Sequence, residues 1–549
     1  MNPQPPVTRM RIAARTSSAE GGALADFPML RNQLDAWKMR LAETGWTPWL
    51  ILGLAVFLRF FLLGIKPPHF DEGINGWFVD QMVKNGFYRY DPTNYHGPLH
   101  FYVLLLSQTL FGRNVWALRL PVVLVSISCV WLCFKFDLLV GRNVARMAAL
   151  AMAVSPGFVF YGRYSIHEVW LVLFSMLFIL GLLGLWKFGT PNYLWYAGIG
   201  LAGMILTKET YVIHVGCAAL AGTVLFFSNR LNPLPDARLA RQTWDYLDLA
   251  FVIAVGAFAI VFFYSGTFFH WSGIKGLYQF YPAWFATGHE GHGHEKEAYN
   301  LIWKNHSWIN YYWVALMARY EWPVLGGLTL CVFCQRFKNL SLRYLAIYGV
   351  GTLIAYSIVN YKTPWCIISF IWPFLFIFGA AMLVIPLRYR LVTYVASIVL
   401  LCASLGSTIW LNYFRCTTDT EPYVYVQTYN DICKLTRPLL QLAKRDPRYY
   451  QLTGHMIRTS AYPLPWILGD FPHIGYYEHE NLPAKLDADF LLVQEDRIKE
   501  VEPKLHGSYY TTPLKIRAYQ DTSKLYLSAK IFREFFPGRP PDFMGKGPG

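Results

Sequence analysis

The chain has 549 residues, of which 54% are hydrophobic, 17% are aromatic and only 15% are charged. Soluble globular domains carry about 25% charged residues, so this composition excludes a soluble protein and predicts a multi-pass membrane protein. The net charge of +15 comes without a basic stripe interleaved with aromatic residues, and no nucleic-acid partner is therefore expected.

Apolar runs along the chain predict an α-helical bundle of about eleven membrane spans. The runs cover residues 47–65, 116–136, 143–160, 169–186, 193–207, 211–227, 246–265, 313–334, 343–359, 366–385 and 391–411. Residues 47–411 thus form a predicted transmembrane domain, which contains two long loops at 66–115 and 266–310.

Lys and Arg residues concentrate in the N-terminal tail, residues 1–46, and in every second loop of this map. Loops rich in these cations stay in the cytoplasm, and the tail lacks the apolar core and cleavage site of a signal peptide. We therefore expect a protein of the cell (inner) membrane with a cytoplasmic N-terminus. The two long loops and everything after residue 411 are expected on the outer side.

The composition changes to a mixed-charge pattern in residues 412–549. Alternating apolar residues predict strands in the segments PYVYVQT, DFLLVQED, TPLKIRAY and KLYLSA. Amphipathic periodicity predicts helices over 429–444 and 496–505. The sequence therefore predicts a small extracytoplasmic α/β domain, and it leaves open whether Cys416 and Cys433 in this region pair.

An acidic pair, Asp71 and Glu72, follows the first apolar run directly, in the string HFDEG. Carboxylates at the mouth of a membrane helix indicate a functional site. Acids in the first turn of a helix also stabilise its N-terminus without any catalytic role, and both interpretations stay open for this pair. The same loop then brings His96 and His100 close to a third carboxylate, Asp91.

Charged and imidazole side chains recur at the predicted outer ends of the apolar runs. They are Arg59 in the first run and Arg163, His167, Glu168, Lys208, Glu209 and Lys362 in later turns. Each of them alone would suit a structural ion pair. Because each costs insertion energy in a membrane, their recurrence on one side predicts a pocket for an anion, for which a lipid phosphate is the natural ligand.

The loop 266–310 contains the histidine-rich string GHEGHGHEKE. Such tracts can bind metal ions, but histidines separated by glycines lack the fixed geometry of a metal site. A flexible loop is the preferred interpretation.

The order of these motifs resembles that of the GT-C glycosyltransferases, which use polyprenyl-phosphate sugars. Protein O-mannosyltransferases and lipid A aminoarabinose transferases, of the glycosyltransferase family 39 type, are similar over the first half of the chain. A closer resemblance is to the multi-spanning family named for its association with archaeal lipid flippase activity. Its signatures HxDE, YDPxYHGP, SP…YxRY, TKE and KTPW appear here at 69–72, 90–98, 155–164, 207–209 and 362–365.

The resemblance implies a GT-C fold, a polyprenyl-phosphate-linked sugar donor and contact with membrane lipids. The expected catalytic residues are Asp71, Glu72 and Glu168, and the expected ligands of the donor phosphate are Arg59, Arg163, Lys208 and Lys362. Substrate binding is expected from His69, Tyr95, His96, His100, His167, Glu209 and Trp365. No cofactor is firmly implied and no metal ligands are assigned; a divalent metal stays open. The second outer turn carries His167 and Glu168 where relatives commonly carry Asp.

An outward-facing site requires a donor delivered by lipid, because nucleotide sugars are cytoplasmic solutes. We therefore predict an inverting glycosyltransferase in which Asp71 is the general base toward an acceptor on a protein, lipid or glycan. The alternative is a lipid-linked sugar flippase or a flippase-associated membrane protein. That function needs charged groups along a route across the membrane, whereas the charges here gather on one predicted face, which favours the enzyme.

Overall fold

The structure is a computed structural model that describes residues 45–94, 96–231, 233–234, 238–290, 310–359, 361–478, 481–518 and 520–545. Contacts between Cα atoms divide the chain into two units, Met1–Leu50 and Ile51–Gly549. The elements described below belong to the second unit, apart from the first turn of helix α2 (Thr47–Phe60). The predicted tail, residues 1–46, falls almost wholly outside the described residues.

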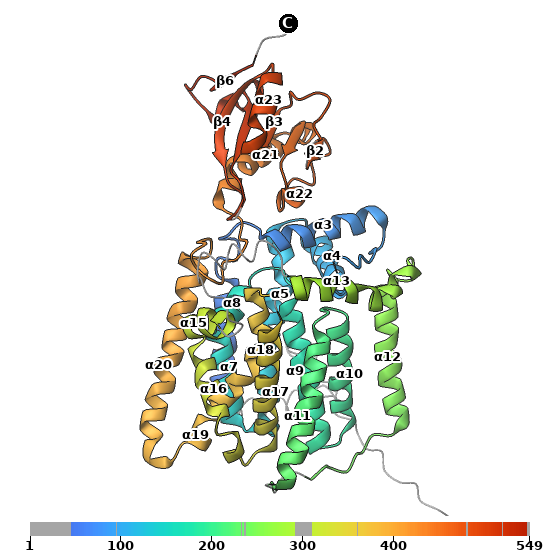
Figure 1. Cartoon of the computed structure of the whole chain (residues 1–549), viewed down its shortest axis with the longest axis vertical. Coiled ribbons are helices and arrows are strands. Elements are labelled where there is room, and N and C mark those ends of the chain that lie inside the picture. Colours follow the sequence, from blue (N-terminus) through green and yellow to red (C-terminus); the bar gives the residue numbers. More distant parts are fainter. Residues whose placement is uncertain are drawn as a thin grey trace, which may run out of the picture. The chain divides into compact units, whose positions relative to one another are not determined.

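Apolar helices form the larger part of the second unit (Figure 1). The longer ones after α2 are α5 (Val115–Lys135), α7 (Arg142–Val154), α9 (Glu168–Lys187), α10 (Pro191–Ile205), α11 (Tyr211–Leu231), α12 (Tyr246–Tyr264), α16 (Trp322–Cys331), α17 (Leu340–Ile358), α18 (Ile367–Gly379) and α20 (Arg390–Ile409). Short helices accompany them: α6 (Asp137–Val140), α8 (Pro156–Tyr161), α15 (Ala318–Tyr320) and α19 (Ala381–Val384).

Each predicted apolar run coincides with one of these helices or with a succession of them. Within the described residues, five stretches are long and apolar enough to cross a membrane: Val115–Val140, Glu168–Lys187, Tyr211–Arg230, Tyr246–Tyr264 and Leu387–Phe414. Shorter apolar helices cover Thr47–Phe60, Leu99–Phe111, Trp322–Cys331 and Pro364–Gly379. The chain is thus a mainly helical integral membrane protein, and the number of spans stays a prediction.

Two of the predicted runs are interrupted next to a proline. Ser155 leaves the helical conformation and caps α8, whose first residue is Pro156, a position that proline favours. The run 313–334 breaks at Glu321, just before α16. The buried Glu321 carboxylate accepts hydrogen bonds from Ser155 Oγ and Gly157 N, both at 2.7 Å. The carboxylate at one interruption therefore satisfies the first donors of the helix that begins at the other.

The largest hydrophobic cluster lies inside the helical bundle and includes most of α18. The Trp372 side chain of α18 is completely buried and packs on Phe136, in the turn between α5 and α6, and on Tyr348 of α17. This core fixes the ends of the helices, from which several side chains of the candidate site extend.

Three further helices, α3 (Phe70–Asn85), α4 (Leu99–Phe111) and α13 (Gly276–Glu290), run across the direction of the bundle in Figure 1. Helix α3 packs on α22 (Leu464–Ile467) of the C-terminal region. A Cβ atom on Gly73 would lie 2.5 Å from Pro463 Cα, and one on Gly76 would lie 2.4 Å from Trp466 Cδ1. The two glycines of HFDEGING therefore allow the C-terminal region to approach α3 closely.

The C-terminal region contains a six-stranded sheet in the order β2-β1-β3-β5-β4-β6. The strands are β1 (Gly454–Ile457), β2 (Ile474–Tyr477), β3 (Phe490–Gln494), β4 (Ser508–Leu514), β5 (Ser523–Ser528) and β6 (Phe543–Met544). Strand β1 pairs in parallel with β2 and β3, and the other pairings are antiparallel. The helices of this region besides α22 are α21 (Cys433–Arg445), α23 (Ile498–Val501) and α24 (Ala529–Phe532).

Alternate residues of β3 enter different hydrophobic clusters on the two faces of this sheet, as strand geometry requires. Phe490 and Leu492 pack in the cluster that contains α21, whereas Leu491 and Val493 pack in the cluster on the other face. The small α/β region expected from the sequence is thus present. Cys416 and Cys433 are both free thiols.

One predicted strand is absent from the described residues. The segment PYVYVQT, residues 422–428, makes a single isolated bridge, Thr428 to Arg517, in place of a strand. Pro422, Tyr423 and Val424 are consecutive buried residues, and Tyr423 stacks on Tyr320 of the helical bundle at 4.5 Å between ring centroids. The alternation in the sequence is not matched by an alternation in burial, because the segment packs on helices and not in a sheet.

Candidate active site

The first turn of α3 carries the acidic pair, as predicted. His69 is the N-cap residue, and its Nδ1 accepts a hydrogen bond from the backbone N–H of Asp71 at 3.1 Å. Its Nε2 then carries the proton and donates to the Tyr425 carbonyl oxygen at 2.8 Å. Burial lowers the pKa of His69 to about 4, so the neutral ring is a fixed part of the helix cap.

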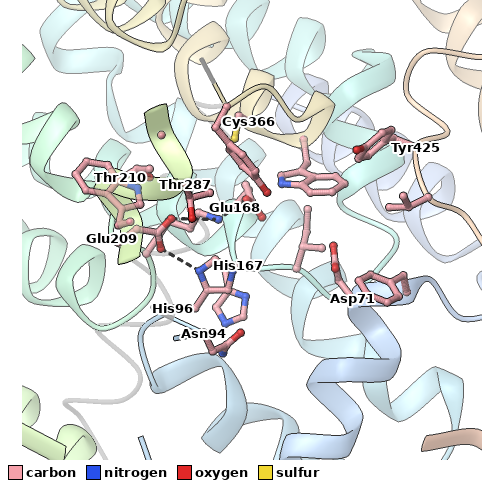
Figure 2. Close-up of a pocket in the computed structure, with 18 of the residues that line it drawn as sticks. Asp71, Asn94, His96, His167, Glu168, Glu209, Thr210, Thr287, Cys366 and Tyr425 are labelled. Carbon is pink, nitrogen blue, oxygen red and sulfur yellow. Dashed lines mark hydrogen bonds and ion pairs between the residues drawn. The ribbon is translucent and has the colours of Figure 1, made fainter. Parts of the chain in front are cut away.

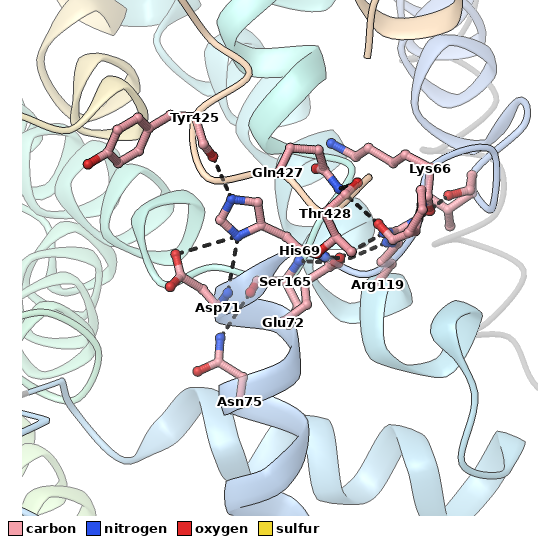
Figure 3. A network of polar contacts seen from close by, with 12 residues as sticks. Lys66, His69, Asp71, Glu72, Asn75, Arg119, Ser165, Tyr425, Gln427 and Thr428 are labelled. Carbon is pink, nitrogen blue, oxygen red and sulfur yellow. Dashed lines mark hydrogen bonds and ion pairs between the residues drawn. The ribbon is translucent and has the colours of Figure 1, made fainter. Parts of the chain in front are cut away.

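Glu72 is held in a buried polar network, which Figure 3 shows. Its carboxylate accepts hydrogen bonds from Arg119 Nε at 2.8 Å and Arg119 Nη2 at 2.7 Å. The backbone N–H groups of His69 and Ser165 donate to it as well, at 2.8 and 2.9 Å. We call Lys66, Glu72, Arg119 and Ser165 the Glu72 junction. Burial raises the pKa of Glu72, but the charge and hydrogen bonds of Arg119 outweigh this and keep it below its usual value.

Asp71 faces the other way and lines a cavity of about 590 Å³. Its side chain is 30% exposed, and the nearest partner is His69 Nδ1 at 3.6 Å. That nitrogen already accepts a hydrogen bond, so it offers no proton to the carboxylate. Burial and the nearby charge of Glu168 raise the pKa of Asp71 to about 7, against the opposing effect of Lys208 and Arg517. An uncommitted carboxylate with such a pKa suits general-base chemistry near neutral pH.

The cavity is built from distant parts of the chain. Its walls come from the start of α3, the turns before α9 and α11, helix α13, the segment 356–366, the linker at 425–426 and the sheet region around 460 and 517–520. Seven of the residues predicted from the sequence line it: Asp71, His96, His167, Glu168, Lys208, Glu209 and Trp365. The structure thus brings together side chains that lie almost 300 positions apart.

A salt-bridge cluster forms one wall of the cavity (Figure 2). Lys208 Nζ lies 2.6 Å from Glu168 Oε1 and 3.7 Å from Glu209 Oε1. Glu209 Oε2 in turn accepts a hydrogen bond from His96 Nδ1 at 2.9 Å. Burial lowers the pKa of Lys208, but the two carboxylates raise it well above its usual value. The ammonium is therefore charged and already shared between two anions.

Three histidine rings lie in contact beside this wall, in tilted and edge-on arrangements. The centroid of His167 lies 4.5 Å from that of His96 and 4.4 Å from that of His100. His100 does not line the cavity: its Nδ1 accepts from Trp170 Nε1 and its Nε2 donates to Ser165 Oγ, both at 3.0 Å. Burial and the neighbouring histidines keep the pKa of His167 well below its usual value, so this ring is neutral at pH 7.

Three of the four cations predicted to bind the donor phosphate lie outside the cavity lining. Arg59 donates to Ser126 Oγ at 2.7 Å and to the carbonyl oxygens of Ala55, Met152 and Ala153. Arg163 donates to the carbonyls of Leu58, Phe61 and Leu62. Lys362 donates to those of Tyr356, Ser357 and Val359. Helix ends expose carbonyls without partners, and these carbonyls take the donors that the sequence suggested for a phosphate.

The remaining predicted residues are not part of the cavity lining that the structure describes. Glu72 and His69 are absent from the cavity lining, for the reasons given above, and Tyr95 lies outside the described residues, as do His292 and His294 of the histidine-rich string. No group of three or more His, Cys, Asp or Glu side chains suited to a metal occurs in the ranges that the structure describes. The acids of the cavity wall, Glu168 and Glu209, have Lys208 as their cation.

The sequence interpretation missed several residues of the site. Arg119, the partner of Glu72, stands alone in an apolar run, a pattern that itself indicates a buried partner. Arg517, Ser460 and Tyr425 line the cavity from the C-terminal part of the chain. Nothing in their local sequence distinguishes them, because an arginine, serine or tyrosine next to a strand is ordinary.

Comparisons with known proteins bear on this arrangement. Residues 95–263 match the family model of the dolichyl-phosphate-mannose-protein mannosyltransferases. The structure is similar to that of ArnT from Cupriavidus metallidurans in the apo state, with a TM-score of 0.60, 15% identity, and coverage of 89% of this chain and 99% of that one. The chain has the GT-C fold. The resemblance to the GT-C glycosyltransferases is thereby confirmed, together with the predicted fold class.

Two further comparisons concern the same GT-C fold. ArnT from Cupriavidus metallidurans bound to undecaprenyl phosphate matches with a TM-score of 0.59 and 14% identity, covering 88% of this chain and 98% of that one. The oligosaccharyltransferase of Archaeoglobus fulgidus in complex with Zn and sulfate matches with a TM-score of 0.50 and 12% identity, covering 88% of this chain and 73% of that one. Among curated protein sequences there is no match.

Proposed function

We propose that this chain is an inverting glycosyltransferase that moves a sugar from a polyprenyl-phosphate donor to an acceptor hydroxyl on the outer side of the membrane. The observation that carries this proposal is the carboxylate of Asp71, which faces a cavity at the meeting point of the bundle and the C-terminal region. The GT-C fold, the mannosyltransferase-type segment at 95–263 and the undecaprenyl phosphate bound by a protein of the same fold support the choice of donor.

In this mechanism Asp71 takes the proton of the acceptor hydroxyl while the acceptor oxygen forms a bond to the anomeric carbon. The bond between that carbon and the phosphate oxygen breaks, and the polyprenyl phosphate leaves with the electron pair. Attack and departure on opposite faces of the sugar predict inversion in a single displacement. A base with a pKa of about 7 is well matched to this proton transfer at neutral pH.

The salt-bridge wall is proposed to bind the sugar. Glu168 and Glu209 present carboxylate oxygens at the cavity, held in place by Lys208, and carboxylates readily accept hydrogen bonds from hydroxyl groups. Trp365 supplies an aromatic surface in the same cavity. Such a mixture of apolar walls and a few fixed polar groups is typical of small-molecule sites.

A transfer assay tests the proposal most directly. Membranes that contain the protein are given radiolabelled polyprenyl-phosphate sugars, and the products are fractionated into protein, lipid and glycan, with the anomeric configuration determined by NMR. Asp71→Asn should lower the rate about 10²-fold to 10⁴-fold, because the base is lost. Asp91→Asn is the matched control, since Asp91 lies in the same loop, bonds locally to Thr93 and is not among the residues that line the cavity.

Near wild-type turnover of the Asp71→Asn variant would refute the role of Asp71, and a product of retained configuration would refute the single displacement. The assay also separates the alternative function, because a flippase would move the labelled donor across the membrane without forming a new glycoside. For the orientation, a reporter fused after Gly549 that works only in the cytoplasm would contradict the proposed outer side.

A further inference from the structure

Lys208 and Arg517 are the Lys and Arg side chains that line the cavity in the described part of the chain. They differ in their partners. Lys208 is compensated by Glu168 and Glu209, so a phosphate beside it would also meet two carboxylates. Arg517 has no carboxylate oxygen within 4.0 Å among the described residues, although its side chain is only 5% exposed.

Arg517 is held by neutral groups, and the Asp71 carboxylate interacts with its charge without forming an ion pair. Its guanidinium lies over the ring of Phe70, with 3.9 Å from Cζ to the ring centroid. Its Nη2 donates to Ser460 Oγ at 3.0 Å and its Nη1 to the Tyr462 carbonyl at 3.4 Å. These contacts use only part of its donors. Ser460 has a φ of 51°, a strained conformation for a serine that often marks a functional site.

A second arginine stands behind the first. Arg458 is buried and donates to Ser523 Oγ and Gln520 Oε1, both at 2.9 Å. Gln520 in turn donates through Nε2 to the Ser460 carbonyl at 3.2 Å. No ion pair of Arg458 occurs within the described ranges. Two buried cations without carboxylate partners are costly for a protein, and an anion in the cavity would offset this cost.

We infer that Arg517 binds the phosphate of the lipid-linked donor, so that the C-terminal region, rather than the membrane helices, supplies the main cation of the site. This inference rests on the proposed function. A guanidinium binds phosphate oxygens through two parallel hydrogen bonds, and the stack on Phe70 fixes its plane. As the phosphate departs with additional negative charge, the fixed cation stabilises it.

The apolar part of the cavity favours a lipid phosphate over a soluble one. Beside the polar groups, the lining includes Ile74, Ile213, Phe285 and Ile358. These side chains have no polar partner to offer to an inorganic phosphate or to the ribose and base of a nucleotide, whereas an isoprenoid chain would bury apolar surface against them. Inorganic phosphate and a nucleotide sugar share the anionic chemistry and are therefore included as probes.

The test measures binding to the purified full-length protein in nanodiscs. The probes are undecaprenyl phosphate, the neutral alcohol undecaprenol, inorganic phosphate and a nucleotide sugar. We expect Arg517→Met to lower the affinity for undecaprenyl phosphate at least about tenfold, as for the loss of a charge-assisted hydrogen bond. The affinity for undecaprenol should stay unchanged. Arg517→Lys should give an intermediate affinity. Arg445→Met is the matched control, since it removes the same charge from an exposed pair with Glu534.

The outcomes separate the two proposals. If the wild type prefers undecaprenyl phosphate to undecaprenol and Arg517→Met keeps that preference, the inference is wrong while the proposed function stands. If the wild type binds no polyprenyl phosphate at all, the proposed function itself fails. Tighter binding of inorganic phosphate or the nucleotide sugar would overturn the lipid assignment. If Arg517→Met does not fold, Phe70→Leu replaces it, because this change removes the ring under the guanidinium. Phe70→Leu must then lower the affinity for undecaprenyl phosphate more than the affinity for undecaprenol.

Discussion

The two acids of HFDEG have neighbouring positions and opposite environments. Glu72 is completely buried, and Arg119 and two backbone N–H groups satisfy its carboxylate. Asp71 faces the cavity with no such partner and a pKa raised to about 7. Successive residues of a helix point about 100° apart, so one helical turn can direct Glu72 into the buried network and Asp71 into the cavity. One acid of the pair therefore anchors the helix start, and the other faces the cavity, where we propose that it acts as the base.

The largest expected effect is the loss of stability when Glu72, the buried acid of the pair, is substituted. Glu72→Gln removes the charge that compensates Arg119 and should destabilise the fold by about 3 to 5 kcal/mol, the cost of an uncompensated buried charge. Thermal unfolding in detergent measures this. Asp71→Asn should unfold at the same temperature or higher at pH 8, because it removes a carboxylate whose ionised form is disfavoured in the folded state. Equal losses of stability in both variants would contradict the division.

The pH dependence of the proposed reaction sharpens the role of Asp71. The titratable groups that act on it electrostatically or lie beside it are His69, Glu72, Tyr164, Glu168, Lys208 and Arg517. Because a base must be ionised, kcat/KM should rise about tenfold per pH unit below about pH 7 and level off above it. Arg517→Met removes a cation that lowers the pKa of Asp71, and the limb should therefore move to higher pH. Initial rates across this range measure both profiles.

One other group titrates in the same range and serves as the control. Burial lowers the pKa of Lys66 in the Glu72 junction to about 7, and its Nζ lies 4.0 Å from the ring centroid of Phe160. Lys66 is not among the residues that line the cavity, so Lys66→Met should retain the acidic limb. If the rise of kcat/KM below about pH 7 disappeared in Lys66→Met and kept its original pH in Arg517→Met, the rise would report the Glu72 junction and not Asp71.

Much of the fold and part of the site could be predicted from the sequence. Apolar runs located the helices, because burial and membrane insertion both select long apolar segments. The position of Asp71 at a helix start followed from its place after the first run. The cations were harder, because a helix end offers its own carbonyls to the same arginine or lysine that an external phosphate would attract. Arg163 and Arg517 look alike in sequence, and only tertiary contacts show that the first is used up by carbonyls.

The smallest expected effect tests this last contrast. Arg163→Met removes donors from the carbonyls of Leu58, Phe61 and Leu62, and Leu62 already has a φ of 50°. We expect a loss of about 1 to 3 kcal/mol in stability, since buried acceptors lose their partners. The affinity for undecaprenyl phosphate should change by less than about threefold, because the Arg163 guanidinium donates to backbone carbonyls and does not line the cavity. Binding and melting measured on the same preparation give both numbers. If Arg163→Met lowered the affinity for undecaprenyl phosphate as much as Arg517→Met does, both arginines would act on the donor. The distinction between cations that cap helix ends and the cation of the cavity would then be wrong.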